Sequence, residues 1–182
     1  MNTKKDRRTV VVGVTGSIAA YKACELVRLF VKNGDDVHVA MTDHAKAFVT
    51  PLTFQTLSRN PVYTELFARP DDWRPGHISL AEAADLVVVA PATANIIAKM
   101  AQGIADDYLS SMLLATKAPI LVAPAMNVGM YENAATQANL ATLRARGVIL
   151  VEPDAGELAC GTTGVGRLAD PSVIFKAAQS FT

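Results

Sequence analysis

Short runs of apolar residues alternate with longer amphipathic segments along the whole chain. Runs this short and this apolar are typical of strands that are covered on both faces of a parallel sheet. We expect buried strands at Thr9–Val14, Val37–Met41, Leu86–Ala90, Ile120–Ala123 and Val148–Val151.

The segments between these strands carry apolar residues at helical spacing, as Leu26, Val27 and Phe30 do within the expected helix Ile18–Lys32. Further helices are predicted at Pro51–Arg59, Ile96–Ala101, Asp106–Ala115 and Glu132–Arg146. This alternation predicts an α/β fold, a Rossmann-like (flavodoxin-like) doubly wound parallel sheet with right-handed crossovers, in a single domain over residues 1–182. The glycine-rich stretch Glu152–Asp170 is expected to be an irregular loop of the functional kind.

The composition of the chain argues against several classes of binding partner. Lys plus Arg and Asp plus Glu number 17 each, so the chain has no basic surface of the kind that nucleic acid or an anionic membrane attracts. No apolar stretch approaches the roughly 20 residues of a membrane-spanning helix, and the charged start does not resemble a secretory signal. The two cysteines, Cys24 and Cys160, lie far apart without metal-type spacing, which favours a reduced, cytoplasmic setting and no metal site.

The first strand runs directly into the turn Gly13–Ala19. Glycine there lets backbone N–H groups approach an anion, the following helix N-terminus favours its charge, and Ser17 adds a hydroxyl. Thr15 replaces the middle glycine of the dinucleotide fingerprint, which favours a mononucleotide phosphate over NAD. A tight turn with Ser17 as N-cap would explain the same residues. Thr42, after the second strand, is positioned to contact the same phosphate or simply to cap a helix.

Two further strands end in candidate binding segments. In Pro91–Asn95 the small residues permit close approach of a planar ring, and Thr93 and Asn95 offer hydrogen bonds to its polar edge; Asn95 as a helix cap is the alternative. In the run that begins at Pro124, Asn127 presents an amide that can hold a carboxylate, and Met130 a polarizable surface for an aromatic ring. Core packing of the methionine and capping by the asparagine explain either residue alone.

Two residues have the reactivity that catalysis needs. His77 is expected on a loop before a short helix, as a neutral base, although a loop histidine bonded to backbone is as good an explanation. Cys160 lies between Ala159 and Gly161 with Arg167 nearby, a setting that suits a reactive thiol or a proton donor. Cys24, on the apolar face of the first helix, is interpreted as core packing.

Taken together, five segments in this order resemble the flavin-dependent cysteine decarboxylases, most closely those that act on 4'-phospho-N-pantothenoylcysteine in coenzyme A biosynthesis. The likeness extends from about residue 8 to about residue 181. The segments are Gly16–Lys22, Gly76–His77, Pro91–Asn95, Pro124–Tyr131 and Ala159–Gly161.

The resemblance implies bound FMN and a lyase that converts this substrate to carbon dioxide and 4'-phosphopantetheine through a thioaldehyde and an enethiol. In the family's pattern His77 is the base of the oxidation half, Asn127 holds the substrate carboxylate, and Cys160 donates a proton to the enethiol from a loop that clamps over the substrate together with Ala159 and Gly161. The FMN residues it implies are Gly16, Ser17, Ile18 and Thr42 for the phosphate and its chain, and Thr93, Asn95, Ala125 and Met130 around the ring.

Relatives of this kind form homotrimers, often four trimers together as a dodecamer, with sites between subunits, and in bacteria they are commonly followed by a phosphopantothenate–cysteine ligase domain. This resemblance leaves open whether the chain is the N-terminal half of a longer protein. Thr162 stands where the family usually has Asp, and Tyr131 where many members have Trp. Two other functions remain alternatives: oxidative decarboxylation of a peptide's C-terminal cysteine, which needs no reducing thiol, and a non-enzymatic flavin-binding regulatory subunit.

Overall fold

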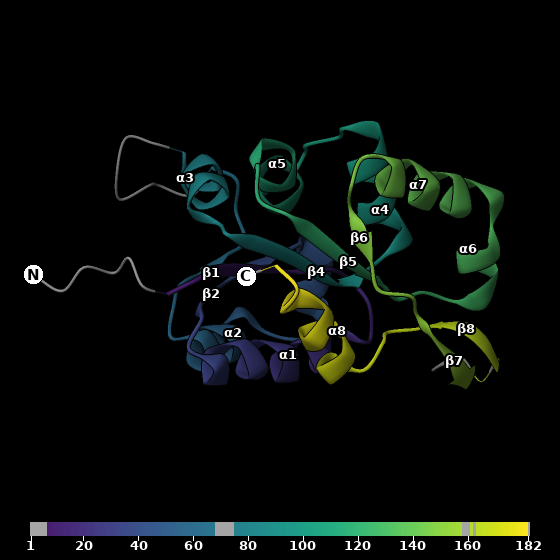
Figure 1. Ribbon diagram of the computed structural model, residues 1–182, viewed down its shortest axis with the longest axis horizontal. Coiled ribbons are helices and arrows are strands. Elements are labelled where there is room, and N and C mark those ends of the chain that lie inside the picture. The colour runs from purple at the N-terminus through teal and green to yellow at the C-terminus, as the bar shows by residue number, and fades with distance from the viewer. Residues whose placement is uncertain (1–6, 68–74, 158–160, 162, 182) are drawn as a thin grey trace, which may run out of the picture.

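A six-stranded parallel sheet forms the centre of the molecule in the computed structural model (Figure 1). The structure describes residues 7–67, 75–157, 161 and 163–181. The strand order is β3-β2-β1-β4-β5-β6, with every pair parallel. The strands are β1 (Thr9–Val14), β2 (Asp36–Met41), β3 (Val62–Tyr63), β4 (Leu86–Ala92), β5 (Ile120–Pro124) and β6 (Ile149–Leu150).

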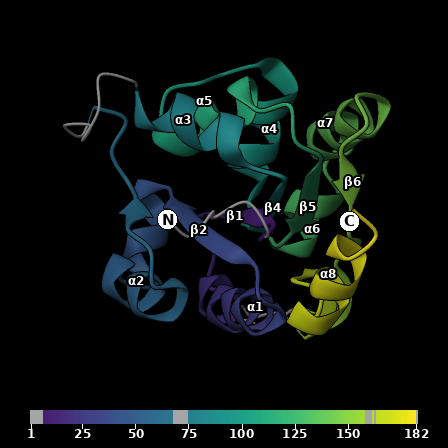
Figure 2. The same ribbon diagram turned by 60° about the vertical axis from the view of Figure 1, so that its left-hand side comes forward.

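Helices cover both faces of this sheet (Figures 1 and 2). One face packs against α1 (Ala20–Asn33), α2 (Pro51–Ser58) and α8 (Pro171–Ala178), and the other against α3 (Gly76–Ala83), α4 (Ala94–Gln102), α5 (Tyr108–Ala115) and α7 (Ala134–Ala145). Successive side chains of β1 alternate between the two cores, since Val10 and Val12 belong to one and Val11 to the other. The predicted doubly wound architecture is therefore confirmed. Among the described helices, none is long and apolar enough to cross a membrane.

The position of the ligand site follows from the strand order. The chain leaves β1 toward β2 and β3 on one side, then crosses to β4 on the other side of β1. In an open sheet, ligands bind outside the carboxyl ends of the strands at such a reversal. The loops after β1 and β4 meet there.

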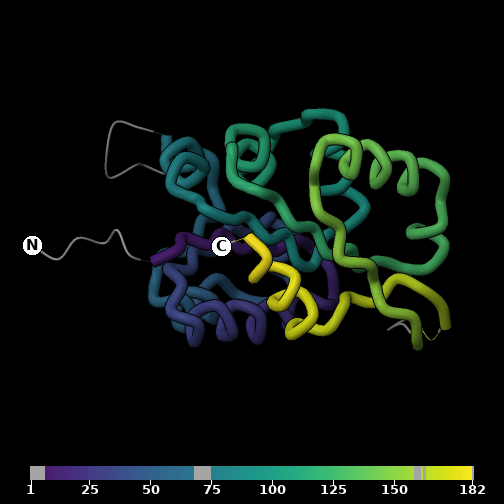
Figure 3. Tube along the Cα trace, in the orientation of Figure 1, coloured from purple at the N-terminus to yellow at the C-terminus, as the bar shows by residue number. Residues whose placement is uncertain are grey.

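The structure adds β3 and α8, which were not expected, and it corrects two other segments. The helix expected at Glu132–Arg146 is found as α7, but it begins only at Ala134, because the Asn133 side chain accepts a hydrogen bond from Ala135 N and caps it there. A separate short helix, α6 (Val128–Glu132), precedes it and was not expected. The stretch expected to be irregular contains an antiparallel hairpin, β7 (Asp154–Glu157) and β8 (Thr163–Arg167), which extends past the end of the sheet beside α6 (Figure 3).

Glycines let this hairpin pack closely on the loop after β5. Met126 N donates to Gly166 O at 3.0 Å. A Cβ on Gly166 would lie 2.3 Å from Met126 O, and one on Gly164 would lie 2.7 Å from Val128 Cγ2. The glycines of this segment therefore position the hairpin against the β5–α6 loop.

Gly166→Ala is expected to lower the free energy of unfolding by about 1–3 kcal/mol, because the added methyl clashes with backbone at a φ of +151°. Chemical denaturation of the two proteins measures the difference. Gly147→Ala is the control, since its φ is +84° and nothing lies within 4 Å of the added Cβ. An equal loss in both variants would show that backbone strain, not the close approach to Met126, is the cause.

Candidate functional site

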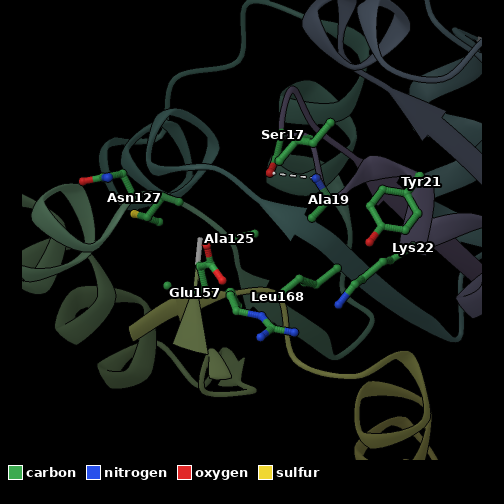
Figure 4. Close-up of a pocket in the computed structure, with 12 residues that line it drawn as sticks. Ser17, Ala19, Tyr21, Lys22, Ala125, Asn127, Glu157 and Leu168 are labelled. Carbon is green, nitrogen blue, oxygen red and sulfur yellow. Dashed lines mark hydrogen bonds between the residues drawn. The ribbon is translucent and has the colours of Figure 1, made fainter. Parts of the chain in front are cut away.

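Two pockets lie at the carboxyl ends of the strands, on either side of the turn between β1 and α1. The strand-end pocket has a volume of about 450 Å³ and the hairpin pocket about 630 Å³. The strand-end pocket is lined by Thr15, Gly16, Thr42, Asp43, His44, Thr93, Ala94, Asn95, Ile96, Lys99, Asp106, Asp107 and Met130. The hairpin pocket is lined by Ser17, Ile18, Ala19, Tyr21, Lys22, Ala125, Met126, Asn127, Glu157, Gly166, Arg167 and Leu168 (Figure 4).

Thr15 joins the ends of β1 and β4 beneath the strand-end pocket. Its hydroxyl donates to Pro91 O at 2.7 Å and accepts from Thr93 N at 3.1 Å. Thr93 is the N-cap of α4, because its Oγ1 accepts from Ile96 N. The alternative in which Asn95 caps this helix is therefore wrong: Asn95 lies inside the first turn of α4 and lines the pocket.

Gly16 and Thr42 form the opposite wall. A Cβ on Gly16 would lie 2.4 Å from His44 Cβ, so only glycine leaves room for this approach. Thr42 Oγ1 is buried and has no hydrogen-bond partner in the described part of the chain. Although Thr42 precedes the 3₁₀ helix Asp43–Ala47, its side chain makes no capping bond. A buried hydroxyl without a partner points to a missing ligand group.

The acidic residues of the strand-end pocket are paired with lysines. Lys99 Nζ lies 2.6 Å from Asp106 Oδ1 and 2.9 Å from Asp107 Oδ2, and Lys46 Nζ lies 2.7 Å from Asp43 Oδ1. Burial acts to raise the pKa of Asp107, but hydrogen bonds from Ser110 and Lys99 outweigh it and hold this pKa below its ordinary value. The two lysines compensate two of the three carboxylates, so one formal negative charge remains at this pocket.

Asp107→Ala is expected to cost about 1–2 kcal/mol of stability at pH 7, since it removes the N-cap of α5 and a partner of Lys99. The folded pKa is lower than the unfolded value of about 3.9, so this contribution is complete above that value and fades as the pH falls through it. Denaturation curves at pH 7 and pH 3 should show the difference from wild type shrinking in acid. Asp43→Ala, whose ion pair is solvent-exposed, should change stability much less at either pH.

Five of the predicted cofactor residues thus share the strand-end pocket: Gly16, Thr42, Thr93, Asn95 and Met130. They supply hydroxyl and amide hydrogen bonds, a backbone turn at a helix start, and a thioether that is half exposed. This set fits a phosphate-bearing planar cofactor. The buried Thr42 hydroxyl, which has no partner among the described residues, supports the fit, because such a cofactor would offer it a hydrogen bond. No cluster of three potential metal ligands occurs among the described residues.

The remaining predicted binding residues line the hairpin pocket. Ser17, Ile18 and Ala125 lie there with Asn127. Ser17 Oγ accepts from Ala19 N at 3.3 Å, at the start of α1 (Figure 4). Asn127 Oδ1 accepts from Gly129 N at 2.8 Å and caps α6, so its amide is held at the pocket wall. The capping alternative is confirmed for Asn127, whose side chain also lines the pocket.

His77 and the cysteine segment stand apart from these groups. His77 lies in the first turn of α3 rather than on a loop, and it lines neither pocket. Its Nδ1 is buried without a partner among the described residues, and its ring meets Tyr108 edge-on at 6.1 Å. Helix α3 lies near the opposite end of the molecule from α6 and the hairpin (Figures 1 and 2). A single chain therefore does not bring His77 to Asn127.

The predictions for Ala159 and Cys160 lie outside the described residues. Gly161 beside them has a left-handed φ of +81°. Cys24 packs against the hydrophobic core on the α1 side of the sheet, as interpreted from the sequence. Burial raises the pKa of its thiol. That environment disfavours a reactive thiolate.

Sequence reasoning assigned no role to Lys22 or Glu157, which line the hairpin pocket, and it named Arg167 only as a neighbour of Cys160. Lys22 had a signal, since it is the last residue of the segment Gly16–Lys22 that carries part of the family resemblance. Glu157 had no signal, and the place of Arg167 in the pocket could not be anticipated, because the segment that carries both was interpreted as irregular and its strand pairing was not expected.

Comparison with known proteins identifies the lineage. A family profile described as Flavoprotein matches residues 1–182. The chain belongs to the flavoprotein family. This flavoprotein is 49% identical over 174 residues to the coenzyme A biosynthesis bifunctional protein CoaBC of Bacillus subtilis, covering 96% of the chain and 43% of that protein. It is 51% identical over 167 residues to CoaBC of Escherichia coli, covering 92% and 41%. The chain thus spans less than half the length of these curated relatives.

Solved flavoprotein structures show the same fold. A cysteine-to-serine mutant of PPC decarboxylase, complexed with pantothenoylaminoethenethiol, superposes with a TM-score of 0.85 at 30% identity and covers 96% of this chain and 98% of that one. The FMN-dependent cysteine decarboxylase SpaF gives a TM-score of 0.78 at 29% identity, covering 95% and 98%. The resemblance found in the sequence is confirmed.

Proposed function

We propose that the chain catalyses the FMN-dependent decarboxylation of 4'-phospho-N-pantothenoylcysteine to 4'-phosphopantetheine, a step of coenzyme A biosynthesis. The observation that carries the proposal is the pair of adjoining pockets, one with the partnerless Thr42 hydroxyl and the other with the fixed Asn127 amide. The names of the relatives, CoaBC and PPC decarboxylase, support this substrate over other cysteine derivatives.

The strand-end pocket, together with the adjoining part of the hairpin pocket lined by Ser17, Ile18 and Ala125, is the proposed site of FMN. Gly16, Ser17, Ile18 and Thr42 would hold the phosphate and its chain, and Thr93, Asn95, Ala125 and Met130 would surround the ring. When bound, FMN supplies a reversible hydride acceptor, so that the carbon bearing the thiol can be oxidised and then reduced again. Oxidation to a thioaldehyde lets the adjacent carboxylate leave as carbon dioxide, which an unactivated amino-acid-type carboxylate does not do readily.

The chain's own residues orient the substrate and move protons. Asn127 would donate hydrogen bonds to the carboxylate, and because the amide is neutral it adds no charge that would stabilise the carboxylate against loss. His77 would accept the proton released in the oxidation half. Cys160 would donate a proton to the enethiol carbon in the reduction half, with Ala159 and Gly161 bounding the substrate.

A homotrimer with sites between subunits, or a dodecamer of four such trimers, is part of the proposal. It is supported by the separation of α3 from α6 within one chain, because in such an assembly His77 of one subunit would serve Asn127 of another. Large apolar side chains that are more than half exposed, Leu52, Phe67 and Leu114 among them, offer surface for such contacts. A fused ligase domain and a cytoplasmic location are proposed from the bifunctional relatives.

The test combines a spectrum with a product assay. The purified protein should show flavin absorbance, and incubation with 4'-phospho-N-pantothenoylcysteine should give 4'-phosphopantetheine by mass spectrometry without an added reductant. A peptide ending in cysteine serves as the comparison substrate. Preference for the peptide, with an enethiol as the final product, would favour the peptidyl-cysteine alternative, and a colourless, inactive protein would refute catalysis.

A further inference from the structure

The hairpin pocket contains two cations that the proposed chemistry does not use. Lys22 reaches it from α1, and Arg167 enters from the last residue of β8, on the same wall as Glu157. Figure 4 shows Lys22 and Glu157 extending toward the pocket from opposite sides. Neither Lys22 nor Arg167 forms an ion pair with a described carboxylate.

The position of Arg167 is set by the hairpin. A Cβ on Gly156 would lie 2.7 Å from Arg167 Nη1 and 3.3 Å from its Cδ, so the side chain lies flat against the glycine backbone of the paired strand. Arg167 thereby lines the pocket, although the residue remains exposed to solvent. A guanidinium with its donors presented in this way suits a phosphate.

Other charges nearby do not cancel these two. Glu157 contributes one negative charge to the lining, so the pocket retains a net positive charge. Asp170, close enough to feel Lys22, has its pKa lowered mainly by hydrogen bonds from Ser172, which its carboxylate accepts as the N-cap of α8. The carboxylate of Asp170 is therefore engaged elsewhere and does not line the pocket.

We propose that Lys22 and Arg167 bind the phosphate monoester at the far end of the substrate, an inference that rests on the proposed function. The substrate has an anionic group at each end, a carboxylate and a phosphate, and the two differ in what the enzyme must do with them. The carboxylate must be lost, and it is placed at the neutral Asn127. The phosphate is permanent, and binding it with cations supplies affinity remote from the reacting carbon. The pocket lies between Asn127 and Lys22, and its volume of about 630 Å³ suits a ligand of this size.

The experiment compares substrates with and without the phosphate. For the holoenzyme, kcat/KM is measured with 4'-phospho-N-pantothenoylcysteine and with N-pantothenoylcysteine, and the ratio is the readout. Lys22→Gln and Arg167→Gln should each lower that ratio by about 10-fold to 100-fold, the size of a lost charge-assisted hydrogen bond. Lys32→Gln, an exposed lysine near the other end of α1, should leave the ratio unchanged. Arg167→Lys should lose less than Arg167→Gln.

A second phosphate ester, that of FMN, is the competing occupant of these cations. The FMN dissociation constant of each variant decides between them. Weaker FMN binding with an unchanged substrate ratio would overturn the inference, and so would an unchanged ratio with unchanged FMN affinity. These failures differ from failure of the proposed function, in which the wild-type holoenzyme decarboxylates neither substrate. A melting temperature for each variant shows whether a fall in activity comes from misfolding.

Discussion

Replacement of Cys160 by serine is expected to lower 4'-phosphopantetheine formation by at least about 100-fold while carbon dioxide is still released. The reason is that the two halves of the reaction need different groups. In the proposed reaction, loss of the carboxylate depends on prior oxidation and on Asn127, whereas reduction of the enethiol needs a proton donor at carbon. A serine hydroxyl is a much weaker acid than a thiol, so the reaction should stop at the enethiol.

The measurement is mass spectrometry of the product, with carbon dioxide followed in parallel. The solved relative captured with pantothenoylaminoethenethiol is a cysteine-to-serine mutant, which supports this outcome. Cys24→Ser is the matched control, because Cys24 is half-buried against the core of α1 and should leave the product unchanged. Normal product from the Cys160 variant would show that another group donates the proton.

The architecture and one pocket could be predicted from the sequence because they rest on local patterns. Buried parallel strands such as β1 and β4 are nearly continuous apolar runs, and their order places the loops after them at one edge. The residues at those strand ends, Gly16, Thr42 and Thr93, therefore meet in one pocket as expected. The position of each residue directly after a predicted strand was enough to predict that these side chains would be neighbours.

The β7–β8 hairpin could not be predicted in the same way. Its strands read Asp154–Glu157 and Thr163–Arg167, without the alternation of apolar and polar residues that marks a half-buried strand. It is positioned by contacts with a distant loop, through Gly166 against Met126, and not by its own pattern. The charges that the hairpin brings to the pocket were missed for this reason.

The grouping of His77 with Asn127 is a different kind of problem. Both residues are recognisable from the sequence, but the fold of one chain separates α3 from α6 (Figure 1). Their meeting depends on how copies of the chain assemble, which neither periodicity nor motif spacing reports. It has to be tested by mixing subunits.

His77→Asn and Asn127→Asp are each expected to lower kcat at least about 100-fold, yet coexpressed subunits of the two kinds should regain activity. Aspartate is as good an N-cap as asparagine, so α6 should form normally, while its charge repels the substrate carboxylate. If each site takes His77 from one subunit and Asn127 from its neighbour, random mixing of equal amounts leaves roughly a quarter of the sites intact.

Coexpression of Asn127→Asp with Cys160→Ser is the internal control. The hairpin that flanks the cysteine segment packs on α6, so both groups should come from the same subunit. Every chain in this mixture carries one of the two substitutions. A site that takes both Asn127 and Cys160 from a single chain is therefore never intact, and product formation should stay at the level of the single variants. Regained activity in the Asn127 and Cys160 mixture, or no regained activity in the His77 and Asn127 mixture, would contradict a site shared between subunits. Only a site divided between α3 of one copy and α6 of the next predicts that the second mixture regains activity and the first does not.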